Sequence, residues 1–211
     1  MSEALFVFGA SGHCKVVIDT LRRAGGEVTL LVDDDLRRTG GTILGHVVAG
    51  SRDALVLARE SAGHGIVAIG RNEARLAVAA WLRDSGFGFG VVVDPSAVVS
   101  AFATIGGGTL VVAHAVVNVD ARVGEHVIVN TAATVDHDCV VGDGAHLAPG
   151  VHLCGDVRVG RGTFIGAGTV VVPGVRIGAG AVIGAGSTVL ANVPDCARVA
   201  GSPCRPLGST P

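Results

Sequence analysis

Aromatic and charged residues are scarce in this chain of 211 residues. Phe and Trp together make up 3% of the sequence, Tyr is absent, and charged residues account for 16%. Glycine, by contrast, occurs 33 times, and hydrophobic residues reach 49%. Small and β-branched side chains must therefore build the interior. A chain of this length can bury one large or two small cores without disulfide bonds.

The chain also lacks an excess of either charge. The formal net charge is -2, the pI is near 6.4, and no run of Lys or Arg exceeds two residues. A nucleic-acid-binding protein carries a basic patch or stripe. The sequence therefore predicts no nucleic-acid partner, and any anionic ligand must be held by local groups.

The cysteines and the apolar runs give no sign of secretion or membrane insertion. Five cysteines are scattered without a Cys-x-x-Cys pair, which is typical of reduced thiols in the cytoplasm rather than of a disulfide framework. Residues 1–9 lack the basic segment of a signal peptide. Residues 177–194 are uncharged, but their small residues keep a strict period that a membrane helix does not need. We expect a cytoplasmic protein with no membrane partner.

A six-residue repeat dominates the second half of the chain. Seventeen consecutive hexapeptides carry an aliphatic residue at the same place: Val93, Val99, Ile105, Val111, Val117, Val123, Val129, Val135, Val141, Leu147, Leu153, Val159, Ile165, Val171, Ile177, Ile183 and Val189. This period fits neither an α-helix nor a hairpin array, and it is typical of a parallel β-helix with three hexapeptides per coil. Seventeen sides predict somewhat under six coils, with the aliphatic residues inward.

The most polar part of the repeat is the stretch NTAATVDHDCVV at residues 130–141, where His137 stands between two aspartates. Three six-residue sides per coil place residues eighteen positions apart above one another. His137 is therefore expected between Val119 and Gly155. Glycine at that place would leave space and an accessible backbone beside the imidazole.

The N-terminal part alternates between strand and helix patterns. Strands are expected at residues 4–8, 28–32 and 66–70. One helix should end at Gly25, and two more should run from caps at Ser51 and Asn72 to residues 60 and 82. This alternation is typical of a small parallel α/β unit of Rossmann type. The expected parts are this unit at residues 1–91, the β-helix at residues 92–193 and a tail at residues 194–211.

A glycine turn follows the first expected strand. Gly9, Ser11 and Gly12 would let a phosphate approach the backbone at a helix N-terminus, and the spacing departs from the Gly-x-Gly-x-x-Gly signature. A mononucleotide or nucleotide sugar suits this half-sized unit better than NAD. His13 either caps the helix or touches the substrate. Two carboxylates after the second strand either bind a ribose or base or form a solvated turn: Asp33 and Asp34.

Four motifs together make a family resemblance specific. They are GASGHCKVV at residues 9–17, VAIGRNEAR at residues 67–75, NTAATVDHDC at residues 130–139 and VAGSPCRPL at residues 199–207. Over essentially its whole length the chain resembles the sialic acid O-acetyltransferase and nucleotide-sugar N-acetyltransferase family of NeuD/PglD type. The resemblance implies a nucleotide-sugar-binding domain joined to a left-handed β-helix that uses acetyl-CoA. It also implies a homotrimer with active sites between subunits.

The resemblance assigns roles to the residues at matching positions. It makes His137 the general base, held by Asp138, and places Asn130 next to the amino sugar. Acetyl-CoA would contact His146 and the backbone of Gly155. The nucleotide would be held by the glycine turn and the acidic pair, namely Gly9, Ser11, Gly12, His13, Asp33 and Asp34.

The chemistry of acetyl transfer agrees with these roles. An amine that attacks a thioester must lose a proton as the C–N bond forms, and an imidazole with a pKa near neutrality can accept it. A carboxylate at Asp138 would fix the tautomer of His137 and stabilise the imidazolium, while the backbone N–H of Gly155 could bind the developing oxyanion. Two positions depart from the family pattern, because Cys14 replaces a smaller residue and Asp138 replaces the common Glu.

Other polar residues receive structural interpretations. Cys139 occupies the small position of its hexapeptide and is expected to pack rather than to act as a nucleophile. Asp136 is expected at a surface or an interface. Three histidines outside the motif are expected to be solvated: His114, His126 and His152.

A γ-type carbonic anhydrase, which has a similar β-helix, is the rival enzyme. Its zinc site needs three converging ligands that include a histidine pair five residues apart. His137, His146 and His152 are separated by nine and six positions and do not recreate that pair. No metal is therefore expected.

The resemblance implies an acetyl-CoA-dependent N-acetyltransferase that acts on a nucleotide-linked 4-amino-4,6-dideoxy sugar for surface-glycan biosynthesis. Two alternatives stay open: a sialic acid O-acetyltransferase and a non-catalytic β-helix scaffold. The sequence does not distinguish UDP from GDP or dTDP as the nucleotide.

Overall fold

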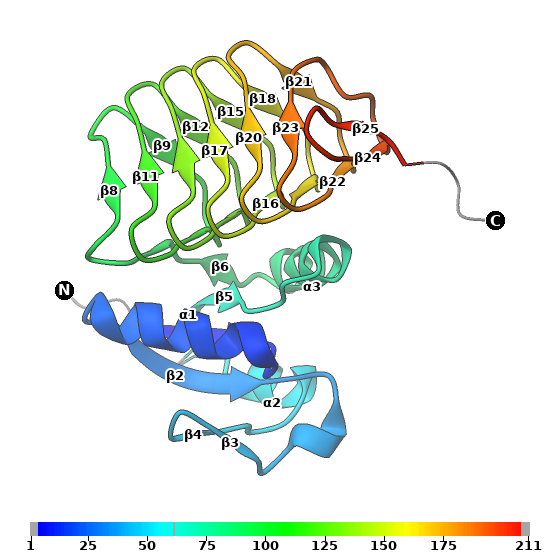
Figure 1. The fold of residues 1–211 in the computed structure, drawn as a ribbon. Helices are drawn as coiled ribbons and strands as arrows, with labels where there is room; N and C mark the ends of the chain where they lie inside the picture. Colours follow the sequence, from blue (N-terminus) through cyan, green and yellow to red (C-terminus); the bar gives the residue numbers. More distant parts are fainter. Residues whose placement is uncertain (1–3, 61, 208–211) are drawn as a thin grey trace.

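The structure, a computed structural model, describes residues 4–60 and 62–207. Figure 1 shows two units side by side, an α/β unit and a β-helix. The α/β unit contains β1 (Ala4–Phe8), α1 (Gly12–Arg23), β2 (Glu27–Val32), a 3-10 turn (Leu36–Arg38), β3 (Thr42–Ile43), β4 (His46–Val47), α2 (Arg52–Leu57), β5 (His64–Val67), α3 (Asn72–Asp84) and β6 (Gly88–Phe89).

The main sheet of the α/β unit is parallel and has the order β2-β1-β5-β6. The side chains of β1 alternate between two buried clusters. Leu5 and Val7 pack with α1 and with the nearest face of the β-helix, whereas Phe6 and Phe8 pack with α3. Elements therefore cover both faces of the sheet, as crossover connections require. The predicted Rossmann-type unit is confirmed.

The strand β5 lies two residues earlier than expected, at His64–Val67 instead of residues 66–70. After Val67 the backbone N–H of Ala68 still donates to the carbonyl of Phe8, whereas the carbonyls of Ile69 and Gly70 accept hydrogen bonds from the side chain of Arg75. The helix α2 follows Ser51 as expected but ends at Leu57 instead of residue 60.

The start of α3 also differs from the expectation. Asn72 is the first helical residue, and the N-cap position belongs to Arg71, which makes no side-chain capping bond. The Asn72 amide instead donates to the carbonyl oxygens of Gly162 and Thr163 in the β-helix, at 2.9 and 3.1 Å. Local preference assigns the Asn72 side chain to the N-cap, but here this side chain contacts the other unit instead.

The β-helix consists of two-residue strands, each on one flat side. They are β7 (Val92–Val93), β8 (Val98–Val99), β9 (Thr104–Ile105), β10 (Leu110–Val111), β11 (Val116–Val117), β12 (Arg122–Val123), β13 (Ile128–Val129), β14 (Thr134–Val135), β15 (Val140–Val141), β16 (His146–Leu147), β17 (His152–Leu153), β18 (Arg158–Val159), β19 (Phe164–Ile165), β20 (Val170–Val171), β21 (Arg176–Ile177), β22 (Val182–Ile183) and β23 (Thr188–Val189).

These strands stack in three parallel sheets, so that each pairs with the strand eighteen residues away. The result is a left-handed β-helix of about six turns, as predicted. The chain then adds β24 (Arg198–Ala200) beside β22 and folds back through β25 (Arg205–Pro206).

The predicted inward residues form the core of the β-helix. From Val111 to Val189 every one of them is buried, while Val93, Val99 and Ile105 in the first coil are half-buried. One side of the β-helix rests on the α/β unit, because Val92, Leu110 and Val112 share a buried cluster with α1 and β1.

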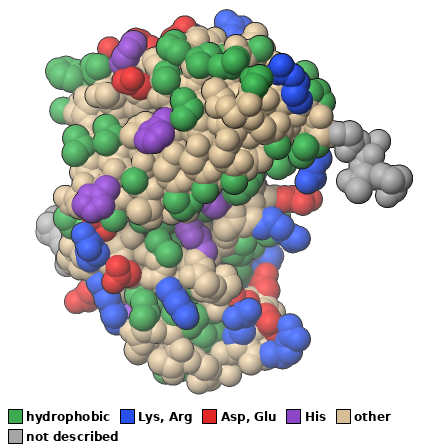
Figure 2. All heavy atoms as spheres, in the orientation of Figure 1, with side chains coloured by type: hydrophobic (Ala, Val, Ile, Leu, Met, Phe, Trp, Pro, Cys, Tyr) green, Lys and Arg blue, Asp and Glu red, His purple; other side chains and the backbone are tan. Residues whose placement is uncertain are grey.

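The two units differ in how many charged side chains their outer surfaces carry. In Figure 2, Lys and Arg side chains lie intermingled with Asp and Glu over the α/β unit, whereas most of the visible β-helix surface is uncharged. Among the residues that the structure describes, no helix has the length and apolar character needed to cross a membrane.

The inward positions should dominate the stability of the β-helix. Leu147 is fully buried, and its replacement by Ala should lower the free energy of unfolding by about 2–5 kcal/mol, because the narrow interior retains a cavity. Leu190, which is 55% exposed, provides the matched control, and Leu190→Ala should cost less than about 0.5 kcal/mol. Urea denaturation of both variants checks this, and equal losses would contradict the inward assignment.

Candidate active site

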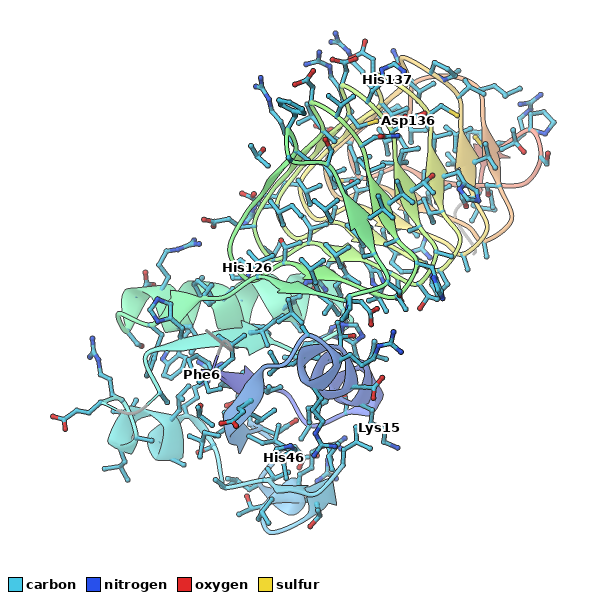
Figure 3. All side chains as sticks on the ribbon, turned by 90° about the vertical axis from the view of Figure 1, so that its left-hand side faces the viewer. Phe6, Lys15, His46, His126, Asp136 and His137 are labelled. Carbon is cyan, nitrogen blue, oxygen red and sulfur yellow. The ribbon has the colours of Figure 1, made fainter. Side chains whose placement is uncertain are left out.

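His137 occupies a corner of the β-helix between β14 and β15. Figure 3 places it, with Asp136, on the side of the β-helix away from the α/β unit. Its Nδ1 lies 2.8 Å from the carboxylate of Asp138, and its backbone N–H donates to the carboxylate of Asp136 at 2.8 Å. A carboxylate only accepts hydrogen bonds, so Nδ1 of the neutral imidazole carries the proton and Nε2 carries the lone pair.

The surroundings of His137 favour its protonated form. The hydrogen bond that His137 donates to Asp138 raises the pKa of His137 above its ordinary value of 6.5, and the nearby charges of Asp136, Asp138 and Asp156 act in the same direction. The ring is 56% exposed, so solvent screens these charges. A base with this environment accepts a proton more readily than free imidazole does.

The corner also shows the predicted stacking of residues 119, 137 and 155. The backbone N–H of Asp138 donates to the carbonyl of Val119, and that of Asp156 donates to the carbonyl of His137. A Cβ at Gly155 would lie 2.5 Å from Cε1 of His137. Only glycine therefore leaves the imidazole in its place, and this part of the prediction is confirmed.

A second group of polar side chains lies between the α/β unit and the β-helix. His146 contacts the carbonyl of Gly70 through Nδ1 and the amide nitrogen of Asn130 through Nε2, both at 3.2 Å. The ring of His13 lies 6.3 Å from that of His146, and the ring of Phe164 stands perpendicular to His146 at 5.2 Å. Residues far apart in the sequence thus meet at the boundary of the two units.

Both histidines of this second group are held neutral. Burial, followed by the positive charge of Arg75, lowers the pKa of His13 and that of His146 to about 4. At neutral pH these rings can accept or donate hydrogen bonds but carry no charge. They can therefore bind polar groups of a ligand without repelling one another.

The glycine turn has the geometry that a close backbone approach needs. Gly9 has a φ of +110°, and a Cβ there would lie 2.9 Å from Cγ1 of Ile69. Ser11 and Gly12 are exposed at the start of α1, and Ser11 makes no side-chain capping bond. The first turn of α1 is thus open to an anionic group.

The acidic pair after β2 has partners within the unit. Asp33 accepts from the backbone N–H groups of Ala10 at 2.6 Å and Asp35 at 2.8 Å, which ties the glycine turn to the end of β2. Asp34 forms a two-pronged ion pair with Arg52, whose guanidinium lies over the ring of Trp81 at 4.5 Å. Asp33 shapes the turn, and the carboxylate of Asp34 stays half-exposed at its edge.

Within one chain the two polar groups do not meet. Asn130 precedes β14 and His137 follows it, so they lie at different corners of the same coil although both belong to the NTAATVDHDC motif. His13, Asn130 and His146 lie near one another at the boundary with the α/β unit. His137, which Figure 3 places at the corner away from that unit, lies beside Gly155 instead.

His126 corrects an expectation, because it is buried rather than solvated. Its side chain is 2% exposed, with the ring perpendicular to that of Phe89 at a centroid distance of 4.4 Å. Burial lowers its pKa to about 4, and within the described chain neither ring nitrogen has a hydrogen-bond partner. The α/β unit covers this corner, which the repeat alone does not reveal. His114 and His152 are exposed, as predicted.

Cys139 is a packing residue, as expected. It is fully buried, its thiol donates to the carbonyl of Cys154 at 3.1 Å, and burial raises its pKa to about 11. In the described ranges, no group of three or more His, Cys, Asp or Glu residues is arranged to hold a metal ion.

Arg75 is the polar residue that the sequence analysis overlooked. It is 1% exposed and faces the same way along α3 as the buried residues Val78, Ala79 and Leu82. Positions 75, 78, 79 and 82 form the apolar stripe of a helix. A charged residue on that stripe was the feature of the sequence that could have identified Arg75.

A groove of about 480 Å³ runs beside His146 along the boundary of the two units. It is lined by Gly70, Arg71, Asn72, Glu73, Gly162, Phe164, Gly180 and Val182. Its wall combines the apolar side chains of Phe164 and Val182 with glycine backbone and with three polar residues, Arg71, Asn72 and Glu73. A long, flexible and partly apolar ligand fits such a surface.

Family models match both parts of the chain. Residues 4–82 match the PglD N-terminal domain, and residues 156–191 match the bacterial transferase hexapeptide of six repeats. No curated protein matches the chain.

Solved structures match nearly the whole chain. A histidine-to-asparagine variant of perosamine N-acetyltransferase from Caulobacter crescentus, in complex with CoA and GDP-perosamine, is 39% identical, with a TM-score of 0.93 and coverage of 99% of this chain and 98% of that one. The acetyltransferase domain of PglB from Neisseria gonorrhoeae FA1090, in complex with acetyl coenzyme A, is 37% identical, with a TM-score of 0.91 and coverage of 98% and 100%. WeeI from Acinetobacter baumannii AYE is 27% identical, with a TM-score of 0.89 and coverage of 97% and 100%.

The ion pair between His137 and Asp138 predicts how a substitution at position 138 changes the pKa of His137. Asp138→Asn should lower the pKa of His137, because a neutral amide stabilises the imidazolium less than a carboxylate does. Titration of the His137 ring by NMR measures the change. Asp84→Asn, which removes an exposed carboxylate at the end of α3, should leave the pKa unchanged. Equal pKa values in wild type and Asp138→Asn would contradict the assignment.

Proposed function

Because the chain belongs to the NeuD/PglD-type family of nucleotide-sugar acetyltransferases, we propose that it transfers the acetyl group of acetyl-CoA to the amino group of a nucleotide-linked 4-amino-4,6-dideoxy sugar. The observation that carries this proposal is the His137–Asp138 pair, with Nδ1 engaged at 2.8 Å and Nε2 left with its lone pair. GDP-perosamine is the first substrate to test, since the Caulobacter relative that is 39% identical holds it.

In the proposed reaction His137 is the general base. The amine nitrogen attacks the thioester carbonyl carbon while Nε2 of His137 takes a proton from that nitrogen. Asp138 stabilises the imidazolium that forms. When the C–S bond breaks, the thiolate of CoA leaves and the proton on Nε2 neutralises it. Activity should therefore rise with pH through the pKa of His137, which lies above 6.5.

The backbone N–H of Gly155 is the proposed oxyanion donor. It donates no backbone hydrogen bond within the described part of the chain, and it lies one coil from His137 with no side chain between them. A donor that is held in place before the reaction stabilises the developing charge without reorganisation.

The α/β unit, residues 1–91, would hold the nucleotide sugar. The phosphates would approach the open start of α1 at Gly9, Ser11, Gly12 and His13, and Asp34 would accept hydrogen bonds at the edge of the turn. Asp33 would act by holding the turn in shape. Asn130, at the boundary of the two units, would contact the amino sugar.

The β-helix, residues 92–193, would carry acetyl-CoA. The pantetheine arm suits the groove beside His146, where Phe164 and Val182 supply apolar contacts. All five cysteines are free thiols. Together with the use of acetyl-CoA, this favours the cytoplasm as the compartment. The acetylated sugar would serve surface-glycan biosynthesis.

The separation of the two polar groups supports a shared site. His137 and Gly155 of one subunit would complete a site whose other wall, with His13, Asn130 and His146, belongs to a neighbour. A closed ring of three subunits provides one such junction for each subunit. We therefore propose a homotrimer with active sites between subunits.

The base assignment is tested by removing the imidazole. His137→Ala should lower kcat for GDP-perosamine by about 10²- to 10⁴-fold, because the amine loses its proton acceptor. Release of free thiol from acetyl-CoA reports the rate. His152→Ala removes another exposed histidine of the β-helix and should keep full activity. Full activity in His137→Ala would contradict the proposal. Turnover of sialic acid in place of any amino sugar would indicate O-acetylation.

The shared site is tested by mixing two inactive chains. His137→Ala and Asn130→Ala subunits, co-expressed with different tags and purified through both, should recover about a third of the wild-type activity, because one of the three junctions in each mixed trimer then combines two intact halves. Each variant expressed alone is the control. Mixed assemblies as inactive as the single variants would show that both residues serve the same subunit's site.

A further inference from the structure

Arg75 is a buried cation without an anionic partner. Its guanidinium is 1% exposed, and within the described residues it forms no ion pair. Six oxygen atoms accept its hydrogen bonds, five from backbone carbonyls and one from the amide of Asn72. A buried charge is costly unless hydrogen bonds satisfy it. A residue kept in this state calls for a role that an apolar side chain could not fill.

The hydrogen bonds of Arg75 cross the boundary between the two units. Nε donates to the carbonyl of His126 at 2.8 Å, and Nη2 donates to that of Gly144 at 2.8 Å, both in the β-helix. Nη1 donates to the carbonyls of Ile69 and Gly70 at 2.9 and 3.1 Å, in the segment that leads into α3. One planar group therefore holds this segment against two coils of the β-helix.

The Gly70 carbonyl connects Arg75 to His146. It accepts from Arg75 and also faces Nδ1 of His146 at 3.2 Å. A carbonyl only accepts, so Nδ1 of His146 carries the ring proton and Nε2 carries the lone pair. Nε2 then accepts from the amide nitrogen of Asn130 at 3.2 Å.

The orientation of the Asn130 amide is settled by this sequence of bonds. Its oxygen accepts from the backbone N–H of Thr131 at 2.8 Å, and its nitrogen donates to His146. If His146 were protonated at Nε2 instead, two donors would face each other and the amide would have to turn. The position of one carbonyl thus determines how Asn130 presents its hydrogen bonds.

We propose that Arg75 is a positioning residue for acetyl transfer, which clamps the Gly70 carbonyl between the two units and thereby fixes the His146 tautomer and the Asn130 amide. The inference rests on the proposed function, in which Asn130 contacts the amino sugar. Burial and the Arg75 charge also keep His146 neutral, with a pKa of about 4, so the tautomer persists at physiological pH.

The geometry explains why the residue is arginine. A guanidinium offers five N–H donors in one rigid plane, whereas an ammonium offers three on a flexible stem. Lysine at position 75 would keep the charge but could not reach the carbonyls of Gly70, His126 and Gly144 together.

The first test compares two conservative variants of the same helix. Arg75→Lys should lower kcat by about 10- to 100-fold, because a misplaced acceptor amine reacts slowly, and should leave KM for acetyl-CoA within about threefold of wild type. Arg83→Lys is the matched control, since Arg83 also crosses the boundary by pairing with Glu125 but is 53% exposed. Its kcat should stay within about threefold of wild type. Wild-type kcat in Arg75→Lys would overturn the proposal.

A second measurement reads the His146 tautomer directly. The ring-nitrogen NMR shifts of His146 in the ¹⁵N-labelled wild-type protein should show the tautomer protonated at Nδ1, and folded Arg75→Lys should show a mixture. An Nε2-protonated His146 in an active wild type would overturn the role of Arg75. Wild-type protein that turns over no amino sugar would overturn the proposed function itself, whatever the tautomer, so the two failures are distinguishable.

Discussion

The hexapeptide repeat imposes the constraint on which the rest of the structure depends, namely that each corner residue lies above the residue eighteen positions earlier. The inward aliphatic residues maintain this register through close packing. The register places Gly155 next to His137 in the neighbouring coil, where any side chain would displace the imidazole. It also aligns Gly144 with His126, so that their carbonyls can be reached by one guanidinium. A deep core thus determines the geometry of groups on the surface.

The boundary between the two units adds what a solenoid alone cannot supply. A β-helix offers flat sides and exposed corners, whereas the second polar group is partly buried under α1 and the segment before α3. Burial there keeps His13 and His146 neutral, whereas the hydrogen bond to Asp138 raises the pKa of the exposed His137. The same type of side chain is thereby neutral in one place and more readily protonated in the other, which suits the proposed roles in binding and in proton transfer.

Much of this arrangement could be predicted from the sequence, because periodicity reports on burial. The six-residue period predicted the β-helix and the neighbours of His137, and the alternating N-terminal pattern predicted the α/β unit. The burial of His126 and the use of Asn72 as a bridge could not be predicted in this way. Both depend on how the two units dock, and docking does not alter the periodicity of the sequence. Arg75 could have been predicted to be special, since it interrupts the apolar stripe of a helix.

In the proposed site, a base on one subunit serves a sugar held by another. The most direct measurement is a crystal structure of the protein with CoA and GDP-perosamine bound. We expect Nε2 of His137 to lie within about 3.2 Å of the sugar's amine nitrogen, and this His137 to belong to a different subunit from the Asn130 that touches the same sugar. An amine placed beside another base, or a His137 and an Asn130 from one subunit meeting at the same sugar, would contradict it.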